Sequence, residues 1–274
     1  MRMTNAEYHA NPAIGSSMLK AFDRSPRHCW QLYFDPDRET PEPSKAFLLG
    51  SAIHAATLEP ATFGERYAVA PVCDRRTKAG KAEWEAFAAA NAARTILAAD
   101  EAETVRGCAK AVRENPLVEE LGLLRGGAAE ESFFFELSGA ACKCRPDYIV
   151  WPCEKYPLGL IVDVKSCEDA RAEAFRRDAW KYGYHIQAGF YQMGVAISLG
   201  LDRYPPFVFL AVEKSAPYGV AVYSASENFA LVGRDRAGEL LQRLKACRDA
   251  GLGAENWPGY PAELNELELP AWAN

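Results

Sequence analysis

Two charged residues interrupt an apolar run at residues 159–166, which read GLIVDVKS. Burying a charge inside a strand is costly unless the charge is paired or binds a ligand. Asp163 and Lys165 are two positions apart, so in a strand both side chains point to the same face. A pair of this kind is most often a partly exposed ion pair on an edge strand, and that interpretation stays open at this point.

A third charged residue, Asp147, borders an apolar run in the sequence RPDYIV. Neighbouring strands can bring Asp147 close to Asp163, and two adjacent carboxylates repel each other unless a cation joins them. Carboxylate oxygens suit Mg²⁺ or Mn²⁺. Lys165 would then lie beside the metal ion, where an ammonium group can orient a water or stabilise charge on a phosphate.

The elements that position these residues follow from the hydrophobic pattern and from its breaks. We expect helices at 16–24, 27–33, 47–58, 81–114, 168–199 and 227–250, with a break near 182–184. We expect strands at ESFFFEL, ACKCRPDYIVW, GLIVDVKS, FVFLAVEK and YGVAVYSAS, the last two as a hairpin. This order predicts an α/β (α+β) fold with a single domain over residues 1–250. Its parts are a helical half at 1–128 and a β-rich core at 129–250, followed by an acidic tail at 251–274.

The composition is that of an ordinary soluble protein, with 274 residues, 49% of them hydrophobic and 25% charged. No apolar stretch approaches the roughly 20 residues of a membrane span. The start of the chain, MRMTNAEYHANP, lacks the apolar segment of a signal peptide. We therefore expect a cytoplasmic protein without a membrane partner. The eight cysteines are scattered along the chain and fit free thiols better than a zinc site.

The net charge of −6 argues at first against a nucleic-acid partner. Residues 251–274 carry four glutamates and no Lys or Arg, so they supply −4 of the −6 and leave −2 on the other 250 residues. A local basic face is compatible with that balance. Two groups of cations stand out, as either solvated faces or phosphate contacts: Arg75, Arg76, Lys78 and Lys81, and Arg176, Arg177 and Lys181.

Aromatic residues follow the second group of cations. Trp180, Tyr182 and Tyr184 could stack on unpaired bases at a DNA end, whereas Phe190 is better explained by core packing.

Four segments occur in a fixed order: LGSAIH with His54, RPD with Asp147, IVDVKS with Asp163 and Lys165, and HIQAGFY with Gln187 and Tyr191. This string resembles the PD-(D/E)XK nuclease superfamily in its RecB-like branch. The segments SSMLKAFDRSPRH, DRRTKAGK and CKCRPDYI are closer still to the phage and prophage exodeoxyribonuclease VIII (RecE-type) nuclease domain. The resemblance covers residues from about 8 to 224 and implies a restriction-endonuclease-like core, with a central mixed β-sheet flanked by helices.

The resemblance also implies the ligands of a metal site. They are His54, Asp147, Asp163 and the main-chain carbonyl of Val164, and they would hold Mg²⁺ or Mn²⁺, with two ions per site. Some relatives carry an iron–sulfur cluster held by one early and three late cysteines. Cys29 could be the early ligand, but Cys247 is the only cysteine beyond residue 200, so we expect no such cluster.

Catalytic roles are implied for the remaining residues of the string. Lys165 would position or activate the attacking water. Gln187 and Tyr191 share a helix face, and they would steady Lys165 and touch the DNA backbone. The family has a further acid at the start of the first strand. We prefer Glu131 to Glu130 because Glu131 shares the parity of Phe133 and Phe135, although two solvated acids remain an alternative.

The implied activity is that of a Mg²⁺-dependent exodeoxyribonuclease. It would degrade linear double-stranded DNA from a 5′ end and leave 3′ single strands for a recombinase or annealing partner. The family also implies a homo-oligomeric ring around DNA, for which we expect a tetramer. One alternative is a nuclease of the same fold that acts on single strands, flaps or special ends. Another is a DNA-binding or assembly protein on a decayed nuclease fold, but every expected catalytic residue type is present.

Overall fold

The structure is a computed structural model that describes residues 3–39 and 42–268. The last residues of the expected acidic tail, 269–274, lie outside the described residues, as do residues 40–41 of a polar loop. All eight cysteines are described, and all are free thiols. None of the described helices combines the length and the hydrophobicity that a membrane-spanning segment requires.

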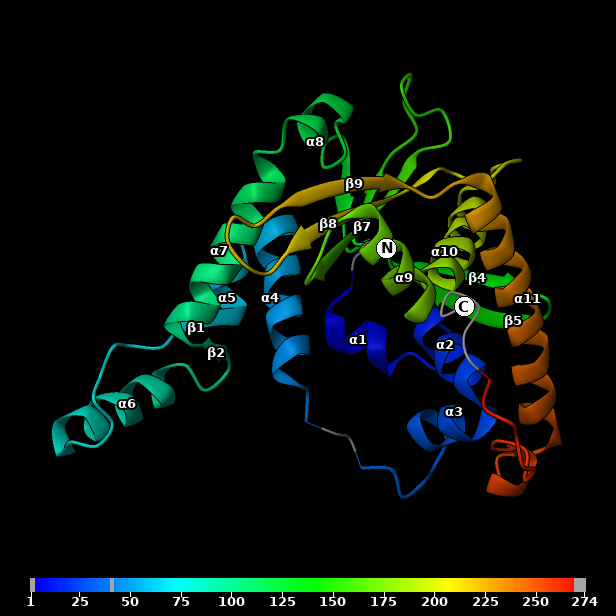
Figure 1. Ribbon diagram of the computed structural model, residues 1–274, viewed down its shortest axis with the longest axis horizontal. Helices are drawn as coiled ribbons and strands as arrows, with labels where there is room; N and C mark the ends of the chain where they lie inside the picture. The colour runs from blue at the N-terminus through cyan, green and yellow to red at the C-terminus, as the bar shows by residue number, and fades with distance from the viewer. Residues whose placement is uncertain (1–2, 40–41, 269–274) are drawn as a thin grey trace.

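A five-stranded mixed sheet forms the centre of the domain (Figure 1). Within it, β7 (Leu160–Cys167) and β8 (Phe207–Glu213) pair in parallel, whereas the other neighbouring strands are antiparallel. The expected hairpin is formed by the last two strands of the sheet. Helices flank both faces, so the predicted fold class is confirmed. In spatial order the strands are β3 (Gly127–Ala129), β6 (Tyr148–Val150), β7 (Leu160–Cys167), β8 (Phe207–Glu213) and β9 (Val220–Ser224).

The central strand β7 is apolar on both faces because a layer of helices covers each face. Val162 and Val164 belong to one hydrophobic cluster with residues of α4 (Lys45–Leu58), α7 (Ala99–Arg113) and α8 (Pro116–Leu121). Ile161 lies in the opposite layer, with α2 (Ser16–Arg24), α10 (Tyr184–Leu199) and α11 (Glu227–Ala250). Asp163 and Lys165 share the parity of Ile161, so both point toward the layer that contains α10.

Local sequence signals fix the helices at the start of the chain. Thr4 and Glu7 form a capping box at α1 (Asn5–Ala10). Ser25 caps α3 (Pro26–Tyr33) by accepting from the His28 N–H, and Pro26 occupies its first position. The hairpin of β4 (Phe133–Leu137) and β5 (Ala140–Cys144) packs on α10, beside these helices.

An arm projects from the body of the domain (Figure 1). It consists of α6 (Lys78–Ala90) and its flanking loops, and α5 (Phe63–Arg66), β1 (Tyr67–Val69) and β2 (Thr95–Leu97) lie at its base. The helical region expected at 81–114 is therefore divided into α6, β2 and α7. A tertiary contact interrupts the helical region, because β2 pairs in parallel with β1, a segment distant in the sequence.

The expected break in the helical region at 168–199 is confirmed. α9 (Ala172–Lys181) ends before Gly183, which adopts the left-handed conformation with φ 64°, and α10 begins at the next residue. At the other end of the domain, a short 3₁₀ helix (Ala254–Asn256) leads to Trp257. Its side chain is fully buried and contacts the rings of Phe22 and Phe34.

Candidate active site

The site lies where β7 extends beyond its neighbour β6. The pairing of these strands stops at Tyr148, which faces Val162, so Val164 has no partner residue in β6. Asp147 takes that place, because its Oδ2 accepts a hydrogen bond from the Val164 N–H at 2.7 Å. The N–H and C=O of one strand residue point to the same side, so the Val164 carbonyl also faces the Asp147 edge.

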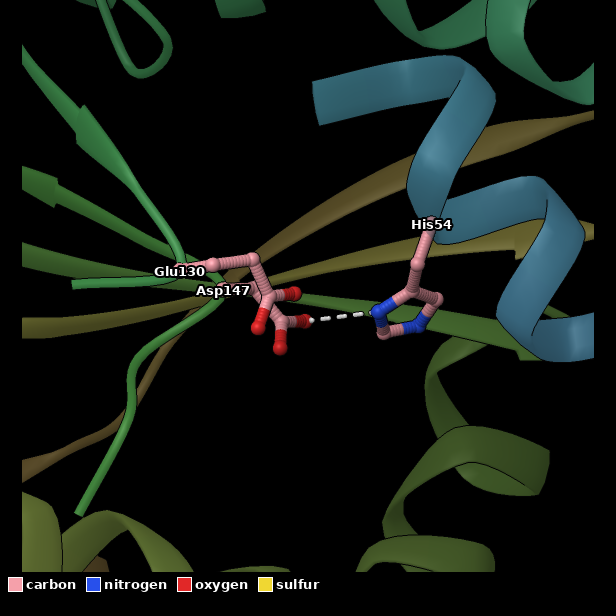
Figure 2. A group of neighbouring side chains, drawn as sticks. All are labelled: His54, Glu130 and Asp147. Carbon is pink, nitrogen blue, oxygen red and sulfur yellow. Dashed lines mark ion pairs between the residues drawn. The ribbon is translucent and has the colours of Figure 1, made fainter. Parts of the chain in front are cut away.

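Three side chains from different elements converge at this edge (Figure 2). His54 comes from α4, Asp147 precedes β6, and Glu130 lies between β3 and β4. His54 Nδ1 is 3.2 Å from Asp147 Oδ2, and one ligand atom of each residue lies within 4.8 Å of the others. An imidazole and two carboxylates form a donor set that fits a divalent metal ion.

Electrostatics at the cluster favours a cation. Burial, and then the nearby Asp147 carboxylate, raise the pKa of Glu130 to about 8, against the lowering effect of Arg145. Ionising both carboxylates at this distance therefore costs free energy unless a cation compensates their charges.

The structure places Glu130, and not the expected Glu131, in this cluster. The parity argument assumed that the strand begins at residue 131, but β4 begins at Phe133. Glu130 has a positive φ of 52°, so the chain turns there and the alternation of an extended strand does not apply. The Glu130 N–H donates to the Asp147 main-chain carbonyl at 3.0 Å, which holds the two acidic residues side by side.

Asp163 and Lys165 form a second, more deeply buried group with Gln187. Asp163 is fully buried, and its Oδ2 contacts Lys165 Nζ. Its Oδ1 accepts from Gln187 Nε2 at 2.6 Å, while Gln187 Oε1 accepts from Lys165 Nζ at 3.2 Å. Gln187 thus bridges Asp163 and Lys165 through two hydrogen bonds. The Asp163 carboxylate is turned toward these two partners and lies outside the three-residue cluster.

The charges of this group depend on one another. Burial raises the pKa of Asp163 to about 6, Lys165 lowers it, and Asp147 raises it further. Burial lowers the pKa of Lys165, but the Asp163 and Asp147 carboxylates outweigh that effect and leave it above its ordinary value. Lys165 Nζ also lies 4.7 Å from the centre of the ring of Tyr184, a residue that the sequence suggests only as a stacking candidate.

A cleft of about 1120 Å³ opens onto the three-residue cluster. Its walls come from α1, the start of α2, α4 and the β-edge, and its lining includes His54, Glu130, Asp147 and Tyr191. Tyr191 is buried at this wall, and burial raises the pKa of its hydroxyl well above the ordinary value. Tyr191 thus lies in the same cleft lining as Asp147, and its expected role beside Lys165 stays a prediction.

Arg145 is a site residue that the sequence analysis did not single out. Its Nε lies 3.0 Å from Glu130 Oε2, and its guanidinium stacks 4.2 Å from the centre of the Tyr8 ring. The neighbouring Lys143 donates to the main-chain carbonyls of Tyr8 and Asn11, at 2.6 and 2.7 Å. These contacts fasten α1 along the cleft. The sequence signal was the position of Arg145 within the segment RPD, two residues before Asp147.

The expected DNA-contacting cations all lie on exposed surfaces away from the lining of the cleft. On the arm, the Arg75 guanidinium stacks 4.1 Å from the centre of a Trp84 ring, and Arg76 pairs with Asp74 at 3.1 Å. The exposed residues of this set are Arg75, Arg76, Lys78 and Lys81 on the arm, and Arg176, Arg177 and Lys181 on α9.

Comparisons with known proteins agree with this fold. A crystal structure described as a "Putative exonuclease" from Eubacterium rectale superposes with a TM-score of 0.61. It is 14% identical, and the match covers 91% of this chain and 88% of that chain, so it shows the fold alone. A structure of SSO0001, 13% identical over 70% of this chain and 84% of that chain, has a TM-score of 0.30 and carries no argument. No curated protein matches.

Sequence comparison identifies the family. Residues 15–267 match the family described as "PDDEXK-like domain of unknown function (DUF3799)". The matched range contains the cluster of His54, Glu130 and Asp147 as well as Lys165 and its partners. Membership in a PDDEXK-like family supports a nuclease function and is consistent with a divalent metal at the cluster. The chain therefore belongs to the PDDEXK-like family DUF3799.

Proposed function

We propose that this protein is a metal-dependent exodeoxyribonuclease that hydrolyses phosphodiester bonds of linear double-stranded DNA. The observation that carries the proposal is the cluster of His54, Glu130 and Asp147 at the wall of an open cleft, with the Asp147 carboxylate in electrostatic contact with Lys165. A metal ion, a lysine ammonium and an accessible groove are the parts that hydrolysis of a phosphodiester requires.

The protein's own residues supply binding and orientation. His54, Glu130 and Asp147 would hold Mg²⁺ or Mn²⁺, with Asp163 and the Val164 carbonyl as further ligands if two ions bind. Such an ion supplies Lewis acidity and lowers the pKa of a bound water. Asp163 and Gln187 hold Lys165 Nζ in a fixed position, so that its charge is available to a phosphate oxygen or to the attacking water without reorganisation.

Other observations support the exonuclease mode, the 5′ to 3′ direction and the choice of DNA as substrate. The motifs resemble those of exodeoxyribonuclease VIII domains, and the superposed E. rectale structure carries the description quoted above.

A digestion assay with end-labelled DNA tests this proposal. With Mg²⁺, a linear duplex should release a 5′ label early as small products, while a 3′ label stays in long single strands. Covalently closed circles should survive, and excess chelator should stop all digestion. Asp147→Asn is the matched inactive control, with its fold checked by circular dichroism. Linearisation of closed circles would favour an endonuclease, and the absence of metal-dependent cleavage would favour a DNA-binding role.

The proposal extends to assembly and location. We expect a homotetrameric ring in the cytoplasm that encloses a DNA end and delivers single strands to an annealing or recombinase partner. Light scattering tests the ring, because four copies of the 30.2 kDa chain have a mass that a monomer or dimer does not approach. A monomer at working concentration, with or without DNA, contradicts it.

A further inference from the structure

A strip of aromatic residues leads from Lys165 to the surface at the junction of α9 and α10. Lys165 lies over the ring of Tyr184, and the Tyr184 ring centre is 6.0 Å from that of Tyr182. Lys181 in turn lies 5.2 Å from the centre of the Tyr182 ring. Two aromatic rings therefore connect the catalytic lysine to an exposed cation.

The outer part of this strip is open to solvent. The side chains of Trp180 and Tyr182 are 64% and 49% exposed. Trp180 stacks on the ring of His185, with centres 4.4 Å apart and planes 13° from parallel, so the indole is held rigid while much of it remains accessible. Large aromatic surfaces that are both rigid and exposed are costly to keep in water, and they are common where a ligand stacks.

Lys20 of α2 lies against the same junction. A Cβ placed on Gly183 would be 3.1 Å from Lys20 Cδ and 3.2 Å from its Cγ, so the lysine stem packs directly on the turn. Burial, and then Lys165, lower the pKa of Lys20 to about 8, while Asp163 opposes them. Lys20 is thus a poorly solvated cation in the electrostatic field of the active site.

Three cations around the strip form no ion pair within the part of the chain that the structure describes. Among the described residues, no acidic side chain forms an ion pair with Lys20, Arg177 or Lys181. The nearest acidic residue in the sequence is Asp178 for Arg177 and Lys181, and Asp23 for Lys20. The surface thus combines stacking rings with cations that no carboxylate binds directly, although Asp163 and Asp169 attract Lys20 and Arg177 from a greater distance.

We propose that Lys20, Trp180, Lys181 and Tyr182 form a binding subsite for single-stranded DNA, which guides unpaired nucleotides to or from Lys165. A nucleotide offers the two features that this surface complements, an aromatic base and an anionic phosphate. The bases must be unpaired, since those of an intact duplex are stacked on each other. The subsite rests on the proposed nuclease function for its purpose, but it can be measured without cleavage.

Fluorescence anisotropy with a labelled oligothymidylate, in excess chelator, tests the subsite in the absence of turnover. Trp180→Ala and Tyr182→Ala should each weaken binding about tenfold or more, as expected for the loss of one stacked base. Tyr182→Phe keeps the ring and should bind as the wild type does. The matched control is Tyr260→Ala, which removes an equally exposed aromatic ring far along the chain, 67% exposed.

Salt dependence tests the lysine separately. Each phosphate contact to a single strand contributes a slope of about −0.7 to the plot of log affinity against log salt. Lys20→Gln should remove about one such contact, and Lys20→Arg should restore it. Lys110→Gln, on the exposed surface of α7, is the control and should leave the slope unchanged. A purely structural role for Lys20 would change stability and leave the slope as it was.

The outcomes separate the two proposals. Variants that bind single strands as tightly as the wild type overturn the subsite, as does equal loss of affinity for blunt hairpin duplex. A wild-type protein with no measurable affinity for single strands also overturns it. Weakened binding of the single strand alone supports the subsite, even if the wild type cleaves no DNA, and in that case only the nuclease proposal fails.

Discussion

In the proposed function, Lys165 is the residue on which the chemistry of the site depends most. Its strand tolerates two charges because Asp163 and Gln187 bind the ammonium group, while Tyr184 covers it. Such a buried charge pair adds little net stability compared with apolar residues of similar volume. Its presence in a central strand is better explained by a role of Asp163 and Lys165 in the candidate active site, which lies at the end of β7.

Replacing Lys165 should therefore impair turnover far more than binding. We expect Lys165→Ala to slow single-turnover cleavage by roughly 10²-fold or more, because the interaction is made mainly in the transition state. DNA affinity should fall much less, since one phosphate contact is a small part of the total. Lys165→Arg should rescue poorly, because a planar guanidinium does not replace a compact ammonium. Cleavage rates close to those of the wild type in both variants would show that the pair is only structural.

Glu130 and Glu131 offer an internal comparison. Glu130→Gln preserves size but removes one carboxylate of the cluster, and it should weaken Mn²⁺ binding by about tenfold or more. Glu131→Gln, the adjacent and chemically identical change, should leave Mn²⁺ affinity near that of the wild type because Glu131 lies outside the cluster. Isothermal titration calorimetry measures both. A larger loss of affinity in Glu131→Gln would restore the assignment that strand parity suggested.

At the scale of elements, the sequence predicted most of the framework because its signals were local. The capping residues, Pro26 and the left-handed Gly183 mark helix ends that the structure reproduces. No local sequence signal predicts the pairing of β2 with β1, because a three-residue strand between helices is specified only by its tertiary partner. The sequence ranked Glu131 above Glu130 for a similar reason, because strand alternation does not predict the positive φ that turns the chain at Glu130.

The helices α10 and α11 cross so closely that their backbones touch. A Cβ on Gly233 would overlap the main-chain carbonyl of His185, whereas a Cβ on Gly238, in the same helix, would meet nothing within 4 Å. Gly233→Ala should therefore lower the free energy of unfolding by about 1–3 kcal/mol or more through overpacking. Gly238→Ala should raise it by roughly 0.5–1 kcal/mol, because alanine favours a helix. Urea denaturation compares the two, and equal effects would contradict the close crossing.

This crossing matters for the site because α10 carries Gln187, the residue that bridges Asp163 and Lys165. Pushing the helices apart should displace Gln187 as well as destabilise the fold. The candidate site thus depends on an element contact whose closeness follows from glycines in both helices, Gly189 and Gly233.

At the scale of the whole molecule, charge is distributed unevenly. The protein carries a net charge of −6, yet four cations gather on the projecting arm, and others flank the aromatic strip on α9. A protein with a negative net charge can attract the phosphates of DNA only through such local positively charged surfaces. On the proposed function, the projection of the arm in Figure 1 would let it contact a duplex outside the cleft at the candidate active site.

The arm should therefore contribute affinity and not chemistry. We expect the triple change Arg76→Gln, Lys78→Gln and Lys81→Gln to lower duplex affinity, and to reduce the salt slope by up to about 0.9 for each phosphate that the arm no longer neutralises. Arg75 is left intact because its stacking on Trp84 has a structural part. Single-turnover cleavage at saturating DNA should stay unchanged, because none of the three residues lines the cleft.

A matched triple change on other elements, Lys110→Gln, Arg203→Gln and Lys245→Gln, shifts the net charge equally and serves as the control. If affinity falls as much in the control as in the arm variant, net charge alone explains the loss. If only the arm variant shows a weaker affinity and a smaller salt slope, the arm is the place where the duplex is held. A loss of cleavage at saturating DNA in the arm variant would instead place these cations in the catalytic step, against the geometry of the cleft.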